Sequence, residues 1–272
     1  MSPAVGTLAI LPVAGPAPPV YLPASPAPAM PSIVVLPTPA AVSDALADRT
    51  ADIVRAVLAA RPRALVCLTG GSTPVAAYTR LAAADGIEWD RVHVFWGDDR
   101  AVGPDDPDSN AGMAQRTLIG PAGIPASNVH RIEGEHGAVE AARRYESCLE
   151  EFFGAARARF DVLHLGMGPD GHVASLFPGS PALGERNRRV VATEAPAGMA
   201  VRDRVSLTLP VLGRSAVTII AAAGADKRDA LAAAFSAAPP PVGRVAPEDG
   251  ELTWILDRAL ADGIVEPTET EG

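Results

Sequence analysis

The chain has 272 residues, 48% of them hydrophobic, and a formal net charge of −9. This length fits one large α/β domain or two small ones, and the apolar content allows a substantial core. The negative charge argues against a nucleic-acid partner, because the phosphate backbone would be repelled. Residues 1–43 carry no charge and so lack the basic start of a secretory signal, and no apolar run reaches the ~18 residues that span a bilayer. We therefore expect a cytoplasmic protein that binds no membrane.

Composition divides the chain into three parts. Residues 1–31 consist largely of Pro and Ala, which predicts a disordered tail, and residues 265–272 are expected to form a frayed acidic tail. Residues 32–264 are predicted to fold as a single α/β domain. The two cysteines, Cys67 and Cys148, lie inside apolar patterns and form no C-x-x-C pair. We expect both to be reduced thiols with no role in a metal or redox site.

Short apolar runs alternate with helical patterns between the tails. The expected strands, in chain order, cover residues 33–36, 64–68, 92–96, 129–132, 162–165, 190–193, 205–209, 217–222 and 253–256. The expected helices cover residues 42–57, 74–84, 109–118, 139–152 and 226–236, and a short helix follows the last strand. This alternation predicts a Rossmann-like α/β fold with a mostly parallel sheet and helices on both faces. Ligands of such sheets bind outside the carboxyl ends of the strands, so the loops there are the candidate sites.

The first such loop reads TGGSTP, at residues 69–74. Glycines let the backbone approach a ligand closely, and the start of a helix favours an anion. Thr73 is a plausible N-cap, with Pro74 as the first helical residue. The loop predicts either a phosphate site or an ordinary strand–helix turn. The donors of a phosphate site would be Gly70, Gly71, Ser72 and Thr73.

Charged residues follow the strand at 92–96. Asp98, Asp99 and Arg100 come directly after Trp96-Gly97. They would stand at the substrate, or they would form only a solvated turn.

A glycine-rich segment, GMGPDGH, follows the strand at 162–165 and occupies residues 166–172. His172 lies at an expected helix start with Asp170 two residues earlier, and this pair has the composition of a general base. Glycines here can expose backbone N–H groups toward an oxyanion. The other histidines are weaker candidates, because three lie inside strand patterns and one in a polar loop: His93, His130, His164 and His136.

A fourth segment, GADK, follows the strand at 217–222. Lys227 would stand in the first turn of a helix, where a cation opposes the helix dipole. A bound anion would offset that unfavourable placement, whereas the alternative is an exposed lysine.

These segments together resemble the 6-phosphogluconolactonases, within the family that they share with the glucosamine-6-phosphate isomerases and deaminases. The matching stretches are LTGGSTP (68–74), VHVFWGDDR (92–100), PDDPDSN (104–110), FDVLHLGMGPDGHVASLFPG (160–179), RVSLTLPVL (204–212), GADK (224–227) and ELTWILD (251–257). The resemblance implies hydrolysis of 6-phospho-D-glucono-1,5-lactone to 6-phospho-D-gluconate, the second step of the oxidative pentose phosphate pathway. It also implies the Rossmann-like sheet, no metal and no organic cofactor. We expect a monomer or a weak homodimer.

On this resemblance the substrate phosphate lies at the start of the helix near Pro74, with Lys227, Arg204 and Arg100 supplying positive charge. His172 takes a proton from the attacking water. Asp170 or Asp98 orients the imidazole or the water. The N–H groups from Gly168 to Gly171 stabilise the oxyanion.

The chain departs from the family pattern at one position. The pattern usually has a glutamate where this chain has Asp99, which questions a positioning role for that carboxylate.

Two alternative functions remain. A deaminase of the same fold would carry a tyrosine at Arg100 and a glutamate at Phe177, and both are replaced here. A non-catalytic sugar-phosphate sensor would require a DNA-binding extension that the Pro/Ala-rich tail does not offer.

Overall fold

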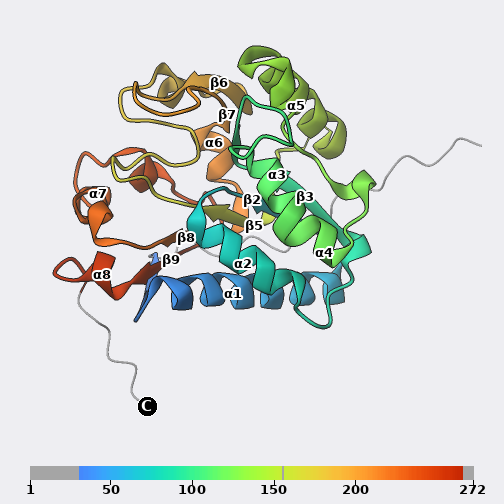
Figure 1. Ribbon diagram of the computed structural model, residues 1–272, viewed down its shortest axis with the longest axis horizontal. Coiled ribbons are helices and arrows are strands. Elements are labelled where there is room, and N and C mark those ends of the chain that lie inside the picture. Colours follow the sequence, from blue (N-terminus) through green and yellow to red (C-terminus); the bar gives the residue numbers. More distant parts are fainter. Residues whose placement is uncertain (1–30, 155, 266–272) are drawn as a thin grey trace, which may run out of the picture.

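The computed structural model describes residues 31–154 and 156–265 (Figure 1). The predicted N-terminal tail lies outside these residues except for Pro31, and the predicted C-terminal tail lies outside them except for Val265. The hydrophobic core extends without a break from α1 (Pro39–Ala60) to α8 (Arg258–Ala261). None of the described helices is both long and apolar enough to cross a membrane.

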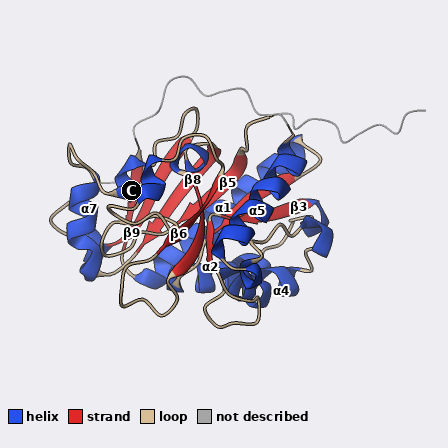
Figure 2. Ribbon diagram, turned by 90° about the horizontal axis from the view of Figure 1, so that it is seen from above, coloured by secondary structure: helices blue, strands red, loops and turns tan. Residues whose placement is uncertain are grey.

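Six parallel strands form the central sheet, in the order β1-β9-β8-β5-β2-β3. Their bounds are Ser32–Leu36 (β1), Ala64–Leu68 (β2), Val92–Trp96 (β3), Phe160–Leu165 (β5), Ser215–Ala222 (β8) and Glu251–Asp257 (β9). Every residue of β2 and β5 is buried, because helices or a second sheet cover both faces of the central strands. Figure 2 shows these strands crossing the middle of the molecule with helices around them. The prediction of a mostly parallel α/β fold is confirmed.

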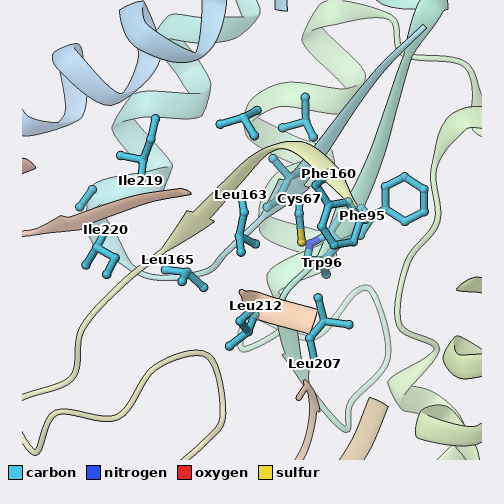
Figure 3. Close-up of a cluster of buried hydrophobic side chains, with 14 of the residues drawn as sticks. Cys67, Phe95, Trp96, Phe160, Leu163, Leu165, Leu207, Leu212, Ile219 and Ile220 are labelled. Carbon is cyan, nitrogen blue, oxygen red and sulfur yellow. The ribbon is translucent and has the colours of Figure 1, made fainter. Parts of the chain in front are cut away.

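A second, antiparallel sheet lies beside the first and carries part of the site. Its strands, in the order β4-β7-β6, are Asp98–Arg100 (β4), Asp203–Leu207 (β7) and Val190–Glu194 (β6). In Figure 3 Leu163 and Leu165 of β5 point toward Leu207 of β7, so this sheet covers one face of the central sheet.

Helices cover the remaining surfaces. Helix α1 packs against α2 (Ser72–Ala82) and the central sheet, while α5 (Ala138–Phe153) packs against β6 and β7 (Figure 1). The shorter helices are α3 (Asn110–Ala114), α4 (Gly120–Ala122), α6 (Leu209–Leu212) and α7 (Arg228–Ala234). Four of the six phenylalanines form one cluster between α5 and the strands β3 and β5: Phe95, Phe152, Phe153 and Phe160.

Several predicted elements differ from the structure. The expected strand at 129–132 is only a single bridge between Val129 and Val94 at the sheet edge. The helix expected at 74–84 begins at Ser72, because Gly71 with a φ of 106° lets the chain turn two residues earlier, and Thr73 is therefore not its N-cap. The helix expected at 109–118 has Ser109 as its N-cap but changes after Ala114 into a π-helical turn. In the helix expected at 226–236, a 3-10 turn that ends at Lys227 precedes α7.

Candidate active site

A cleft of about 280 Å³ opens at the carboxyl ends of the parallel strands. Segments that follow β2, β5 and β8 form its floor, and β4 and β7 form one wall. Ten of the predicted site residues line it: Gly70, Gly71, Ser72, Thr73, Asp98, Arg100, Gly168, His172, Arg204 and Lys227. Gly171 and Asp170 do not line the cleft. Segments up to 158 residues apart in the sequence, Thr69 to Lys227, thus meet at one site.

Residues 69–73, the anion loop, connect β2 to the start of α2. Gly71 is the N-cap residue and no side chain caps the helix, so the first N–H groups of α2 have no partner within the helix. Gly70 lies so close to Asn110 that a Cβ at this position would overlap the Asn110 side-chain amide. The loop therefore offers a close-packed backbone and a helix N-terminus, an arrangement that favours an anion.

Two arginines face each other across the small sheet. Arg100 of β4 pairs with Arg204 of β7 in the antiparallel register, and both side chains line the cleft. Burial, and next the charge of Arg100, lower the pKa of Arg204. The guanidinium of Arg204 donates to the Val201 carbonyl, and that of Arg100 donates to the Asp108 carbonyl while its buried Nε has no hydrogen-bond partner. Two like charges held together in this way favour the binding of an anion between or beside them.

The charge of the cleft is opposite to that of the whole chain. Arg100, Arg204 and Lys227 supply three cations, whereas Asp98 is the one acidic side chain among the residues of the described ranges that line it. Lys227 ends the 3-10 turn Ala225–Lys227 and precedes α7 directly. A chain with a net charge of −9 therefore presents a locally positive pocket.

Backbone N–H groups of the glycine-rich turn after β5 donate hydrogen bonds within the turn itself. Gly168 N–H donates to the His172 carbonyl and Gly171 N–H donates to the Gly168 carbonyl, each at 3.0 Å. These two N–H groups are thus engaged within the turn, and the oxyanion role expected for this segment stays a prediction. Gly168 instead makes room for His172, since a Cβ there would overlap the imidazole. Gly171 has a φ of 78° and packs against Pro240.

His172 is held by Asp170. The imidazole Nδ1 lies 2.5 Å from Asp170 Oδ1, and the same oxygen accepts the His172 backbone N–H at 3.1 Å. An Nδ1–H that donates to this carboxylate leaves Nε2 as the unprotonated ring nitrogen. The ring of Phe177 covers the imidazole with 4.6 Å between the ring centres. The helix that was expected to begin at His172 is absent, because residues 173–176 form a tight hairpin.

Asp98 has a different partner from Asp170. Its Oδ2 accepts the hydroxyl of Ser175 at 2.6 Å, and both side chains are buried at the cleft. The hairpin that presents Ser175 includes Ala174, the one non-glycine residue with positive φ (48°) among the described residues. Such strain is often stored at functional sites. The sequence left open whether Asp170 or Asp98 orients the imidazole. In the structure Asp170 is hydrogen-bonded to the imidazole, whereas Asp98 is hydrogen-bonded to Ser175.

Asp99 anchors the backbone. Its carboxylate accepts N–H groups from Arg100, Asn110 and Ala111 at 2.7–2.9 Å, and it is 1% exposed. Burial raises its pKa to about 6, although the three hydrogen bonds act in the opposite direction. The carboxylate that departs from the family pattern therefore ties β4 to the start of α3 and does not line the cleft.

The remaining histidines do not line the cleft. Burial lowers the pKa of His93 and His130 to about 4 and that of His164 to about 3, so these three are neutral near pH 7. Within residues 31–154 and 156–265, no group of three or more His, Cys, Asp or Glu residues could hold a metal ion.

Several residues that line the cleft had not been predicted as site residues, among them Asn110, Ser175 and Met199. The packing of Phe177 on the imidazole had not been predicted either. Asn110 and Ser175 lie inside the recognised stretches 104–110 and 160–179, which was the available signal. Nothing in the sequence around Met199 points to the site.

Known proteins are similar to this chain in sequence and in fold. Residues 37–254 match the family described as glucosamine-6-phosphate isomerases/6-phosphogluconolactonase. A 6-phosphogluconolactonase of Mycobacterium tuberculosis is 39% identical over 241 residues, which are 85% of this chain and 97% of that protein. One of Nostoc sp. is 36% identical over 233 residues, 79% of this chain and 95% of that protein.

Solved structures agree. The 6-phosphogluconolactonase from Trypanosoma cruzi matches 87% of this chain and 98% of its own, with a TM-score of 0.79 and 26% identity. A monomeric glucosamine-6-phosphate deaminase matches in fold alone, with a TM-score of 0.69 and 19% identity over 85% of this chain and 98% of its own. The chain belongs to the glucosamine-6-phosphate isomerase/6-phosphogluconolactonase family.

Proposed function

We propose that this protein is a 6-phosphogluconolactonase, which hydrolyses 6-phospho-D-glucono-1,5-lactone to 6-phospho-D-gluconate. The observation that carries the proposal is one cleft in which an anion site and a carboxylate-held histidine face the same space. The relatives that cover most of the chain bear the same name. A phosphorylated lactone has both groups that such a cleft would serve, a dianion and a reactive carbonyl.

The 6-phosphate belongs at the positive end of the cleft. The start of α2 and the anion loop provide N–H and hydroxyl donors, and Lys227, Arg204 and Arg100 provide charge. Binding a dianion there relieves the repulsion between the two arginines, whose side chains are held by backbone carbonyls. Anchoring by the phosphate then fixes the ring and places its carbonyl near the turn at 166–172.

His172 serves as the general base. Its Nε2 takes a proton from water as the water oxygen bonds to C1 of the lactone. When the tetrahedral intermediate collapses, the bond between C1 and the ring oxygen breaks, and the histidine returns the proton to that oxygen. Asp170 keeps the imidazole in the required tautomer and stabilises its cationic form, as a carboxylate does in other histidine-based sites.

The deaminase alternative receives less support from the site. A deaminase of this fold would carry a tyrosine at position 100 and a glutamate at position 177. Arg100 here faces Arg204 in the cleft, and Phe177 covers His172. An aromatic ring in place of an acid leaves no proton donor for ring opening, whereas lactone hydrolysis requires none there.

The test is proton release after mixing the protein with freshly prepared 6-phosphoglucono-δ-lactone. A blank without protein measures spontaneous hydrolysis, and unphosphorylated gluconolactone tests the requirement for phosphate. We expect acceleration with the phosphorylated lactone alone. A rate equal to the blank would refute the proposal, and release of ammonia from glucosamine-6-phosphate would then support the deaminase.

A further inference from the structure

A chain of buried polar groups runs beneath the anion loop. Thr50 of α1 lies with its Oγ1 2.6 Å from the Leu46 carbonyl and 2.8 Å from His164 Nε2. His164 Nδ1 lies 3.2 Å from the Tyr78 hydroxyl of α2, and this hydroxyl lies 3.0 Å from the Thr69 backbone N. Tyr78 and Thr50 are 0% exposed and His164 is 1% exposed. Helix α1, the central strand β5 and helix α2 are thus joined to the first residue of the anion loop.

The donors and acceptors fix the direction of this chain. The single hydroxyl hydrogen of Thr50 goes to the Leu46 carbonyl, so Thr50 can only accept from His164, and the ring carries its proton on Nε2. Nδ1 is then an acceptor, and it takes the hydroxyl hydrogen of Tyr78. The Tyr78 oxygen accepts the Thr69 N–H. Burial lowers the pKa of His164 to about 3, which agrees with the neutral ring that this arrangement requires.

We propose that Tyr78 and His164 are positioning residues for the phosphate subsite. Neither lines the cleft, so they act through Thr69, whose backbone they hold at the end of β2. The Thr69 carbonyl oxygen lies 3.3 Å from the same hydroxyl and is a second, competing acceptor for its one hydrogen. At the other end of the loop the Ser43 hydroxyl of α1 donates to the Thr73 carbonyl at 3.1 Å. The glycine pair thus lies between two residues whose backbone atoms are held by side chains of α2 and α1.

The second described tyrosine provides a matched control. The Tyr145 hydroxyl of α5 accepts the Trp96 N–H at 2.9 Å and donates to the Trp96 carbonyl at 3.0 Å, in an equally buried setting. Trp96 ends β3, the neighbour of β2, and leads to Asp98 and not to the anion loop. Tyr145→Phe therefore removes the same atom from a comparable contact, at the end of a strand that does not lead into the anion loop.

The kinetic experiment compares Tyr78→Phe with Tyr145→Phe. For Tyr78→Phe we expect KM for 6-phosphoglucono-δ-lactone and the inhibition constant of 6-phosphogluconate to rise about two- to tenfold, while kcat changes little. This rise corresponds to the net free energy of one hydrogen bond. Tyr145→Phe should lower the denaturation midpoint similarly but leave both constants near wild type. An equal rise in both variants would show a general loss of stability and overturn the proposal, as would an unchanged KM in Tyr78→Phe.

A second measurement tests the hydrogen-bond chain without turnover. Long-range 1H–15N spectra of the labelled protein should show His164 as the neutral tautomer protonated on Nε2, and Tyr78→Phe should shift its Nδ1 resonance. A ring protonated on Nδ1, or a charged ring at pH 7, would overturn the chain. The inference rests on the proposed function for the placement of the phosphate. The two can fail separately. An inactive wild-type protein would refute the proposed function, whereas the spectra and the binding of 6-phosphogluconate test the roles of Tyr78 and His164 directly.

Discussion

At the scale of single residues, the proposal depends most on His172. His172→Ala removes the base while the side chains of the anion site stay in place, since those lie on other segments. We expect kcat to fall by about 10²–10⁴-fold with little change in KM. Steady-state proton release measures both constants. A variant with nearly full kcat would remove His172 from the role of base.

The sequence predicted which residues meet at the site better than what each does there. Glycine-rich strand ends and the strand–helix alternation were enough to bring Gly70, His172 and Lys227 together, because parallel strands place their carboxyl ends along one edge. Hydrogen-bond partners could not be predicted, since they depend on distances of a few tenths of an ångström. Gly168 illustrates this: it had been expected to donate to an oxyanion, but it provides space for the imidazole.

At the scale of elements, the short strand β4 shows where reasoning from patterns fails. Asp98-Asp99-Arg100 has none of the apolar alternation of a strand and was predicted to be a loop. It is a strand because β7 pairs with it and the amides at the start of α3 satisfy the Asp99 carboxylate. Tertiary partners that are distant in the sequence supply this stability, so no local signal reveals it. Conversely, 129–132 had a strand pattern but made only one bridge.

Asp99→Ala tests this junction between β4 and α3. The substitution leaves three backbone N–H groups, those of Asn110 and Ala111 buried, without their acceptor, and we expect a loss of about 2–4 kcal/mol in the free energy of unfolding. The activity should fall as well, because Asp98 and Arg100 lose their support. Urea denaturation and kcat/KM measure the two effects. Asp106→Ala is the control in the same segment, since Asp106 accepts one N–H, from Asp108. Equal losses in the two variants would contradict the anchoring role of Asp99.

At the scale of the whole molecule, the stability should depend on pH through buried groups outside the cleft. Burial lowers the pKa of His93 and His130 to about 4, from about 6.5 in the unfolded chain. The two rings lie 3.1 Å apart between Nδ1 and Nε2 and pack against Phe95 and Phe152, with the Arg63 guanidinium over the Phe152 ring. This cluster, half-buried among aromatic rings and beside a cation, excludes a further positive charge.

The sign of the effect follows from proton binding. Between pH 6.5 and 4 the unfolded state binds more protons at these histidines than the folded state, so their contribution is complete above pH 6.5 and is lost as the pH falls toward 4. Buried His164, with a pKa of about 3, acts in the same direction. Asp99 opposes them, because its pKa of about 6 makes the folded state the better proton acceptor between pH 6 and 3.8. Buried Asp161, whose pKa is raised by burial, acts in the same direction as Asp99. Three histidines against two carboxylates give an expected net loss of stability on acidification.

We therefore expect the urea midpoint to be lower at pH 5 than at pH 7. His130→Gln should reduce this difference, because the substituted side chain does not titrate and the lowered pKa of His130 no longer contributes. His136→Gln is the matched control, since His136 is half-exposed in a polar turn beside Glu133. The slope of stability against pH is the informative quantity, because either substitution can shift the stability at pH 7. A wild-type slope in His130→Gln would show that the buried histidines do not control the response to acid. A rise in stability on acidification would show that proton uptake by Asp99 outweighs their effect.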